Sequence, residues 1–532
     1  MRLVALIHPL LYAFARAAPL AAQPPLHETS LGYRQAGADY NTVEISATLR
    51  LAYVVSTPAG EAVVVDGVRG PLYTEIVRSR LYADGPHPIQ FSPDGARYFY
   101  VARQGDSRFA VVDGVAGPAF EYVDRRSPFS PDSRHVAYVA RRAGKRVVVR
   151  DGVTAPAHDQ VYELQWSSDG NHIVYIAEQA GRKLVVVDDS IVGEGSDIWS
   201  LIVSDSGGRV AYTERRSSGQ VMVVDGAAGK PYREIAPQGR FSRDGRRFVY
   251  AARDTLDHVI VDGVESRAYR QILPGSYGFS ADGKHVAFAG ADEGAQFWVL
   301  DGKEQTHFDA VTVDTQPPFR PDGARLVYTA RRGNAWFVVV GEHESGPYDR
   351  VVRPPRSMPN GQSAYVATQA GRYVVGIDTA TLGFEVVGDL YPLGRSIAMT
   401  VRRSGNWHLI IDGVASAPYP EQMCCVAGSD DGRRSAFHTS QRAGQQLHVV
   451  DGVEERAYDE LRPLRFSPDG RHYAYAARRD TRWLIVLDGQ ELGAYTMMFA
   501  AFPYYGQSSN DAYTVLAQRD GEDIRVSVPW PK

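Results

Sequence analysis

One short segment of the chain combines side chains that could transfer a proton. It runs from residue 77 to 89 and carries Arg78, Arg80, Tyr82 and His87. A general acid or base must reach the transferred proton through a hydrogen bond, and neighbouring arginines can hold an anionic substrate. This combination is compatible with a lyase or hydrolase that acts on a polyanionic glycan. The alternative is a loop insertion without chemistry.

Two other groups of residues also depart from the pattern of the rest of the chain. Asp197 and Trp199 form one group, and Arg353 and Arg356 flank the Pro-Pro pair at 354–355 in the other. Restricted, amphipathic loops on a rigid scaffold are common positions for binding residues. We therefore predict that these four residues bind a ligand, together with those of the segment 77–89.

The elements that must position these residues come from an internal repeat. A turn of the type Phe-Ser-Pro-Asp-Gly recurs at residues 91–95, 129–133, 166–170, 241–245, 279–283, 319–323, 429–432 and 466–470. A Val-rich segment ends in Asp-Gly at Asp66, Asp113, Asp151, Asp225, Asp262, Asp301, Asp412, Asp451 and Asp488. Successive copies are mostly 37–40 residues apart, which gives about 13 copies.

Each copy is predicted to hold four short strands. In the copy at 127–163, for example, we place the last three strands at residues 135–139, 146–149 and 160–164. No stretch shows a convincing helical period. A four-stranded unit of about 38 residues cannot bury both faces alone, so the copies must stack, and radially stacked antiparallel sheets form a β-propeller.

The repeated phrase also carries a family resemblance. The succession FSPDG, RxxAYxAR and VVVDG resembles the WD40-like propeller repeat of TolB-type periplasmic proteins, over about residues 40–530. The resemblance implies an all-β propeller. No separate α/β domain precedes the repeats as it does in TolB, so the envelope partners of TolB are not carried over.

The number of copies bears on the architecture. Thirteen blades exceed the usual 4–8 in one ring. We therefore predict two tandem propellers, at residues 35–290 and 291–532, with the boundary between 270 and 315. The alternative is a single oversized ring.

Side chains that recur at one position of the repeat are predicted to be structural. His135, His172, His285 and His472 all begin the second strand. The aspartates of the turns recur in the same way, each in its own copy, and no EF-hand-like loop is present. We expect these residues to cap turns and pack blades, and we expect no metal ion or other cofactor.

The repeat also places basic and acidic side chains in different turns. The turn after the second strand carries Arg103, Arg141, Arg142, Arg215, Arg216, Arg253, Arg331, Arg332, Arg402, Arg403, Arg442, Arg478, Arg479 and Arg519. The turns on the opposite face carry the repeated aspartates. One Arg-rich face could attract an anionic partner. The alternative is that these arginines pair locally with acidic residues.

Composition limits the function classes. The 58 basic and 62 acidic residues nearly cancel, which excludes a globally basic nucleic-acid binder. Two cysteines in 532 residues exclude a disulfide scaffold and a Cys-rich metal site. Cys424 and Cys425 could form a vicinal disulfide or be two buried thiols on opposite faces of a strand, and we assign them no chemistry.

The first residues resemble a targeting signal. A positive charge at Arg2, an apolar run and small residues before residue 22 are typical of a signal peptide, here residues 1–22. A disordered extension is the alternative. No segment has the apolar length of a membrane span. The sequence therefore predicts an exported, periplasmic or extracellular, non-enzymatic binding protein that recognises a protein or an anionic cell-envelope polymer, with the glycan-cleaving enzyme as the alternative.

Overall fold

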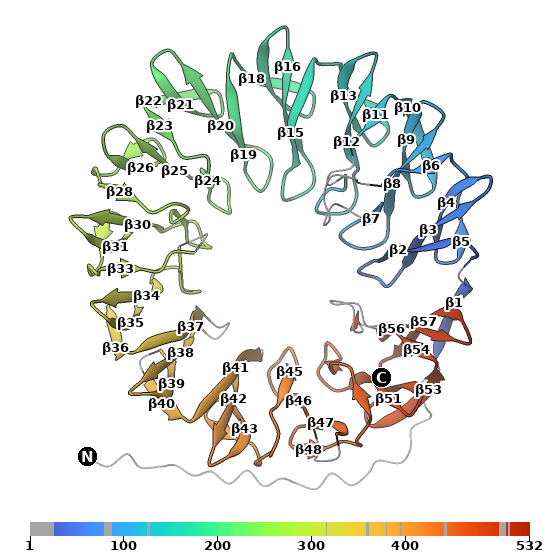
Figure 1. The fold of residues 1–532 in the computed structure, drawn as a ribbon. Helices are drawn as coiled ribbons and strands as arrows, with labels where there is room; N and C mark the ends of the chain where they lie inside the picture. The colour runs from blue at the N-terminus through green and yellow to red at the C-terminus, as the bar shows by residue number, and fades with distance from the viewer. Residues whose placement is uncertain are drawn as a thin grey trace.

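The computed structural model describes residues 26–33, 35–78, 88–124, 128–314, 317–357, 361–378, 380–393, 396–440, 444–499, 507–508 and 511–531. Within these ranges, thirteen antiparallel sheets stand side by side in one ring around a central opening (Figure 1). The predicted all-β propeller is confirmed. The predicted signal peptide, residues 1–22, lies outside the described residues. Over the described ranges, no helix is long and apolar enough to cross a membrane.

The blades are numbered in chain order, and their strands are named from the opening outwards. Blade 1 contains β2 (Ala38–Ile45), β3 (Leu51–Thr57), β4 (Gly60–Val65) and β5 (Val68–Arg69), and blade 2 contains β6 (Glu75–Ile76), β7 (Ile89–Phe91), β8 (Tyr98–Gln104), β9 (Ser107–Val112) and β10 (Val115–Phe120). Blade 3 contains β11 (Tyr122–Val123), β12 (Ala137–Arg142), β13 (Lys145–Arg150) and β14 (Val153–Thr154). Blade 4 contains β15 (Gln160–Trp166), β16 (Ile173–Gln179), β17 (Arg182–Val187) and β18 (Ser190–Gly195). Blade 5 contains β19 (Ile198–Val203), β20 (Val210–Arg216), β21 (Gly219–Val224) and β22 (Ala227–Tyr232), and blade 6 contains β23 (Glu234–Ile235), β24 (Arg240–Phe241), β25 (Phe248–Arg253), β26 (Asp257–Val261) and β27 (Val264–Glu265). Blade 7 contains β28 (Gln271–Ile272), β29 (Gly278–Phe279), β30 (Val286–Asp292), β31 (Ala295–Leu300) and β32 (Lys303–Glu304). Blade 8 contains β33 (Ala310–Val311), β34 (Val327–Arg332), β35 (Ala335–Val340) and β36 (His343–Tyr348).

Blades 9–13 complete the ring. Blade 9 contains β37 (Arg350–Ser357), β38 (Ser363–Gln369), β39 (Arg372–Ile377) and β40 (Ala380–Phe384), and blade 10 contains β41 (Val386–Leu393), β42 (Ser396–Arg403), β43 (Asn406–Ile411) and β44 (Val414–Ala415). Blade 11 contains β45 (Cys424–Gly428), β46 (Ser435–Ser440), β47 (Gln446–Val450) and β48 (Val453–Glu454), and blade 12 contains β49 (Glu460–Leu461), β50 (Arg465–Phe466), β51 (Tyr473–Arg479), β52 (Arg482–Leu487) and β53 (Gln490–Tyr495). Blade 13 contains β54 (Met497–Met498), β55 (Gln507–Ser508), β56 (Ala512–Arg519), β57 (Glu522–Pro529) and β1 (His27–Tyr33).

The number of strands per copy is as predicted, but the phase of the repeat is not. Residues 160–164, predicted as the fourth strand of one copy, belong to β15, the innermost strand of blade 4. The fourth strand of the preceding blade is the two-residue β14. It is short and exposed at its start, so its sequence lacks the alternating apolar pattern that marks a strand.

A single ring, rather than two tandem propellers, is what the structure contains. The predicted boundary at 290–291 falls inside strand β30, which pairs with β31 in an ordinary blade. The ring closes in blade 13, where β1 pairs antiparallel with β57, so the two ends of the described chain share one sheet. Tyr495 and Arg519 both donate hydrogen bonds to Glu28 on β1, at 2.7 and 2.6 Å.

The hydrophobic core is divided among the junctions between blades. Each cluster takes side chains from two neighbouring sheets; Tyr138 of blade 3, for example, packs against Phe99 and Val101 of blade 2. The Ala-Tyr pair of the repeat places a small residue on one face of the second strand and an aromatic ring on the other. No blade therefore has a core of its own, and each blade is stable only between its neighbours.

A carboxylate at the end of the third strand joins the strands of a blade. In blade 5, Asp225 adopts a left-handed conformation with φ of 49°. Its carboxylate accepts hydrogen bonds from the backbone N–H of Val210 at 3.0 Å and from the guanidinium of Arg209 at 2.7 Å. Arg209 also donates to the carbonyl oxygen of Arg246 in blade 6 at 2.7 Å, so one aspartate–arginine pair bonds both within and between blades.

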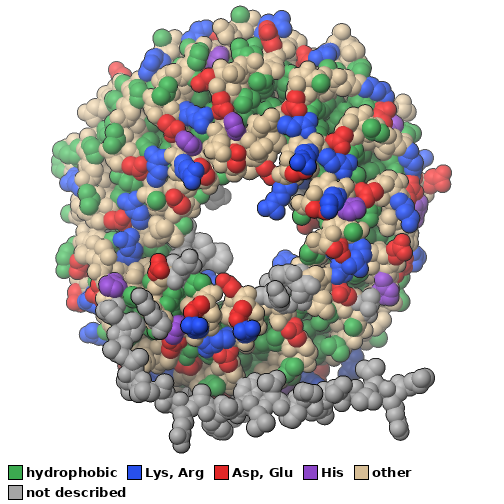
Figure 2. All heavy atoms as spheres, turned by 180° about the vertical axis from the view of Figure 1, so that it is seen from behind, with side chains coloured by type: hydrophobic (Ala, Val, Ile, Leu, Met, Phe, Trp, Pro, Cys, Tyr) green, Lys and Arg blue, Asp and Glu red, His purple; other side chains and the backbone are tan. Residues whose placement is uncertain are grey.

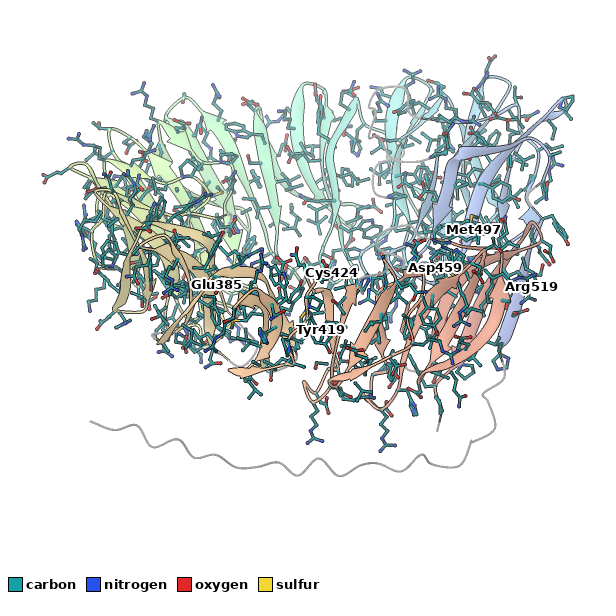
Figure 3. The ribbon with its side chains drawn as sticks, turned by 60° about the horizontal axis from the view of Figure 1, so that its bottom comes forward. Glu385, Tyr419, Cys424, Asp459, Met497 and Arg519 are labelled. Carbon is teal, nitrogen blue, oxygen red and sulfur yellow. The ribbon has the colours of Figure 1, made fainter. Side chains whose placement is uncertain are left out.

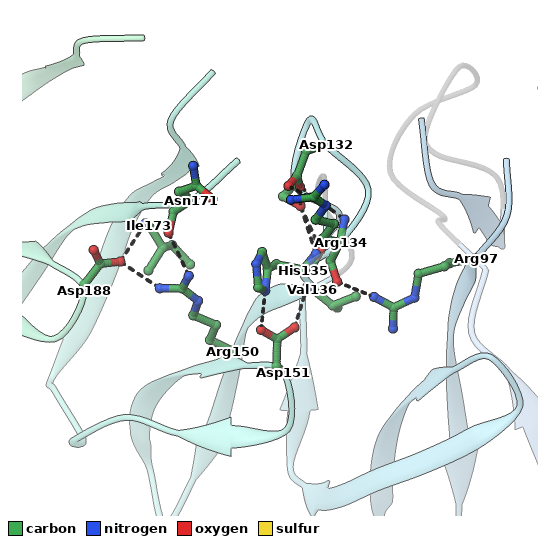
Figure 4. A network of polar contacts seen from close by, with 11 residues as sticks. Arg97, Asp132, Arg134, His135, Val136, Arg150, Asp151, Asn171, Ile173 and Asp188 are labelled. Atoms are coloured by element: carbon green, nitrogen blue, oxygen red, sulfur yellow. Dashed lines mark hydrogen bonds and ion pairs between the residues drawn. The ribbon is translucent and has the colours of Figure 1, made fainter. Parts of the chain in front are cut away.

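The same arrangement recurs around the ring, with histidine in place of arginine in some blades. His135 contacts the carboxylate of Asp151 at 2.7 Å, and Arg97 of the preceding blade donates to the carbonyl oxygen of Arg134 at 2.8 Å (Figure 4). The equivalent pairs are His172–Asp188, His285–Asp301 and His472–Asp488. The prediction that these histidines are structural is confirmed.

The aspartates of the turns cap them, as expected. In blade 6, Ser242 donates to Asp244 at 2.6 Å, and the same carboxylate accepts the backbone N–H of Arg246 at 3.1 Å. These bonds favour the charged form, so the pKa of Asp244 is lowered, and the equivalent bonds lower that of Asp282 to about 2. The next turn ends in Gly283, whose φ of 72° lies in the left-handed region that residues with a side chain rarely adopt.

Replacing Asp225 tests the contribution of this pair. We expect Asp225→Ala to lower the free energy of unfolding by about 1–3 kcal/mol, because the buried N–H of Val210 loses its acceptor and alanine disfavours the left-handed conformation. Asp225→Asn keeps an acceptor and should cost less. Thermal denaturation and hydrogen exchange of the Val210 amide measure both effects. Asp106→Ala, on an exposed turn, is the matched control, and an equal loss in that variant would contradict the assignment.

Acidification tests the closing sheet. The hydrogen bond from Arg519 lowers the pKa of Glu28. A carboxyl whose pKa is lowered on folding adds stability above its unfolded pKa and loses it as the pH falls through the folded value. Between pH 6 and 3 we therefore expect the melting temperature of the native chain to fall further than that of Glu28→Gln. Parallel curves for the two proteins would show that Glu28 does not stabilise the ring.

Candidate functional site

The innermost strands differ in sequence from blade to blade. Strands β15, β19, β37, β41 and β45 border the central opening (Figure 1). In β15, β19 and β45 the pairing with the second strand shifts by a bulge, and the residues at the bulge, Glu163, Ser200 and Cys425, have φ of 52°, 54° and 54°. A bulge breaks the alternation of side chains along a strand and re-aims them.

The predicted segment 77–89 begins after β6 and ends at β7, two strands that both pair with β8 of blade 2, and its residues 79–87 lie outside the described residues. Arg78 is half-buried and paired: its guanidinium contacts Glu61 at 2.8 Å and Asp39 at 3.5 Å. Hydrogen bonds from Arg78 and from backbone Ile76 lower the pKa of Glu61 despite its burial. Arg78 is therefore held in place by carboxylates of blade 1.

Arg80, Tyr82 and His87 lie outside the described residues, so their roles stay predictions.

The second predicted group forms a small local cluster. Asp197 contacts Lys183 at 3.2 Å and Arg215 at 3.5 Å. The guanidinium of Arg215 also lies 5.5 Å from the centre of the Trp199 ring. These contacts hold Asp197 between two cations of blades 4 and 5. The structure does not bring this group together with Arg78 in blade 2 or with the arginines of blade 9.

The third predicted group lies on a strand rather than in a loop. Arg353 and Arg356 are exposed residues of β37, which pairs with β38 around two bulges. Arg353 contacts Asp389 on β41 of the next blade at 2.5 Å. Arg356 has no ion-pair partner among the described residues.

The predicted separation of charge between the two faces is wrong for the described residues, because most arginines pair locally. On the face in Figure 2, acidic and basic side chains are interspersed around the opening. Arginines of the turn after the second strand contact acids of their own or a neighbouring strand in the pairs Arg103–Glu75, Arg141–Glu121, Arg216–Glu214, Arg253–Asp257, Arg332–Glu344, Arg478–Glu460, Arg479–Glu491 and Arg519–Glu28. Arg442 lies outside the described residues.

Blades 9 and 10 depart from this pairing, as blade 8 does in the register pair Ala310–Arg331. In blades 2, 6 and 12 a glutamate of the innermost strand stands opposite the turn arginine, in the register pairs Glu75–Arg103, Glu234–Arg253 and Glu460–Arg478. The same position holds Arg350 opposite Thr368 in blade 9 and Val386 opposite Arg402 in blade 10. The acidic partner is therefore missing from both strands.

Several exposed arginines of these two blades are left without an acid. We call this set the blade 9–10 arginines: Arg350, Arg356, Arg372, Arg402 and Arg403. All five are exposed, and no described residue forms an ion pair with any of them. Arg402 donates only to the carbonyl oxygen of Gly405, at 3.3 Å. The nearby carboxylates of Asp349 and Glu385 accept backbone N–H groups of Gly371 and Ser404 instead.

A further cluster was missed at the level of sequence. Cys424 and Cys425 are exposed free thiols on β45, and their sulfur atoms lie 3.2 Å apart. Nδ1 of His438, which pairs with Cys424 across the sheet, lies 3.6 Å from the Cys424 sulfur. Of the two alternatives left open for these cysteines, buried thiols on opposite faces are excluded, because both thiols are exposed and their sulfur atoms lie close together where Cys425 has a positive φ.

The two thiols differ in acidity. Hydrogen bonds with Cys424 and His438 lower the pKa of Cys425 to about 5, whereas that of Cys424 is raised mainly by its hydrogen bond with Cys425. The sequence signal for this cluster was the register of the repeat, which places residue 438 opposite residue 424.

No protein-family model matches this chain, and no curated protein matches it significantly. Among solved structures, it is similar to the crystal structure of TolB from Acinetobacter baumannii, at 14% sequence identity and a TM-score of 0.21, over 46% of this chain and 75% of that chain. The repeat and the blades described above show that the chain itself is a propeller repeat protein.

Proposed function

We propose that the protein is an exported, non-enzymatic binding scaffold that recognises an anionic partner, a protein or a cell-envelope polymer, through the blade 9–10 arginines. The observation that carries this proposal is their lack of acidic partners among the described residues, in contrast to most of the arginines at the same turn of other blades. The exceptions are Arg142, which lies over the ring of Phe120, and Arg331, which donates to the carbonyl oxygen of Gly333. An exposed cation without an intramolecular partner loses no ion pair when it binds a ligand anion.

The position of these residues supports the same function. Arg350 and Arg372 lie at one edge of blade 9, where β37 and β39 begin, and Arg402 and Arg403 lie at the hairpin that follows β42 in the neighbouring blade. Arg356 lies near the other end of β37, a strand that borders the opening. Because the blades are fixed by their neighbours, these charges are presented at set distances, which favours an extended or repetitive anion.

The proposal can be tested with two defined polyanions, poly-glutamate and polygalacturonate, by fluorescence anisotropy at several salt concentrations. We expect the triple variant Arg350→Ala, Arg372→Ala and Arg403→Ala to bind about 3- to 150-fold more weakly, since each exposed ion pair contributes about 0.2–1 kcal/mol. The dependence of affinity on salt should also decrease.

A second triple variant is the matched control, because it removes the same charge from paired positions. Arg103→Ala, Arg141→Ala and Arg478→Ala should leave the affinity nearly unchanged. If both triples weaken binding equally, the interaction depends on overall charge and not on blades 9 and 10. If neither polyanion binds the native protein, the proposed anionic partner is wrong.

A further inference from the structure

We propose that Cys424, Cys425 and His438 form a binding site for one thiophilic metal ion, Zn²⁺, with one coordination position open towards the central opening of the ring. The site is separate from the proposed binding of polyanions, and it would remain if that proposal failed. Cys424 lies where blade 11 borders the opening (Figure 3).

The donor set fits this ion. The sulfur atoms and Nδ1 of His438 all lie within 4.8 Å of one another. In a tetrahedral site with Zn–S bonds of about 2.3 Å and Zn–N bonds of about 2.0–2.1 Å, a sulfur and a nitrogen are about 3.5 Å apart and two sulfurs about 3.8 Å. The distance from Cys424 to His438 is 3.6 Å, and that between the sulfurs is 3.2 Å. A small rotation of the exposed thiols would meet the requirement.

The orientation of the imidazole also fits. Nδ1 faces the sulfurs, whereas Nε2 is buried and has no hydrogen-bond partner among the described residues. His438 packs beside His448, with ring centres 5.7 Å apart, and His448 is itself fixed by the carbonyl oxygen of Arg462 at 3.0 Å. The ring is thus held by packing with the nitrogen that can bind a metal directed at the thiols.

Adjacent cysteines on a regular strand could not form this site, because their side chains alternate between the two faces. The same bulge occurs in β15 and β19 of the ring, where Tyr162 and Trp199 stand at the position of Cys424. A bulge with a positive φ is therefore common to several blades. Among the described residues, only blade 11 combines this bulge with two thiol ligands and one imidazole ligand that could bind a metal ion. Cys₂His sites leave a fourth position for water or another ligand.

Metal binding can be measured on the reduced, untagged chain after both thiols have been counted by titration. We expect one equivalent of Zn²⁺ in competition with a chromophoric chelator, no binding of Mg²⁺, and thiolate-to-metal charge-transfer absorption on substitution with Co²⁺. Cys425→Ser and His438→Ala should each weaken Zn²⁺ binding by about 100-fold or more, since even the loss of an outer-shell partner costs about 10–100-fold.

His307→Ala is the matched control, because His307 is an exposed histidine of another blade that contacts Glu304. Its affinity for Zn²⁺ should equal that of the native chain. Substoichiometric binding by the reduced chain, an affinity unchanged in Cys425→Ser, or a Co²⁺ spectrum without charge transfer would each overturn the proposal. The exposure of the two cysteines means that their serine variants should fold, which circular dichroism would verify.

Discussion

The ring depends on one ionic hydrogen bond that is repeated from blade to blade. An aspartate in the left-handed conformation ends the third strand and receives both a backbone N–H and the cation that begins the second strand. Where that cation is arginine, it also reaches the next blade, as Arg209 does. Because apolar clusters are shared between neighbouring blades, this polar contact fixes how the sheets approach one another, and the apolar contacts stabilise the resulting spacing.

Blade 9 shows how strongly this requirement is maintained. It lacks the Ser-Pro-Asp-Gly turn, yet Asp378 at the end of β39 still accepts the N–H of Ser363 at 2.9 Å. The cation comes from the preceding blade, where Arg320 contacts Asp378 at 3.0 Å. The repeat can therefore lose its characteristic turn and keep its electrostatic contact. Blades 9 and 10 also lack the glutamate that stands opposite the turn arginine in blades 2, 6 and 12, so Arg402 has no acid across the sheet.

Much of the fold follows from the sequence because the same turn and strand motifs recur in many copies of the repeat. The recurring Asp-Gly and Ser-Pro-Asp-Gly turns predict the number of blades, the four strands and the structural role of the histidines. The start of each four-stranded copy was predicted at the wrong strand, because the outer strands, such as Val153–Thr154, are too short and exposed to show an alternating apolar pattern. Whether the thirteen blades close into one propeller or two depends on a small rotation between neighbouring blades, and no single residue encodes that rotation.

The candidate sites were harder to predict for a physical reason. Residues that break the repeat, such as Arg78 and Asp197, were good candidates in sequence. In the structure Arg78 contacts carboxylates of blade 1 and Asp197 contacts Lys183 and Arg215, and strand pairing is needed to see these contacts. Cys424 and Cys425 were passed over because regular alternation would separate their side chains. The positive φ of Cys425 reverses that expectation, and a local backbone conformation of this kind is not visible in residue types.

The closing sheet also sets the order in which the ring can be completed. Glu28 and Arg519 are 491 residues apart in sequence, whereas the strands of each of the other twelve blades come from one continuous stretch. Bringing such distant segments together has a high entropic cost and is slow. Until it happens, the other blades can form only an open arc, whose two terminal sheets expose an unpaired face and a strand edge that could associate with another chain.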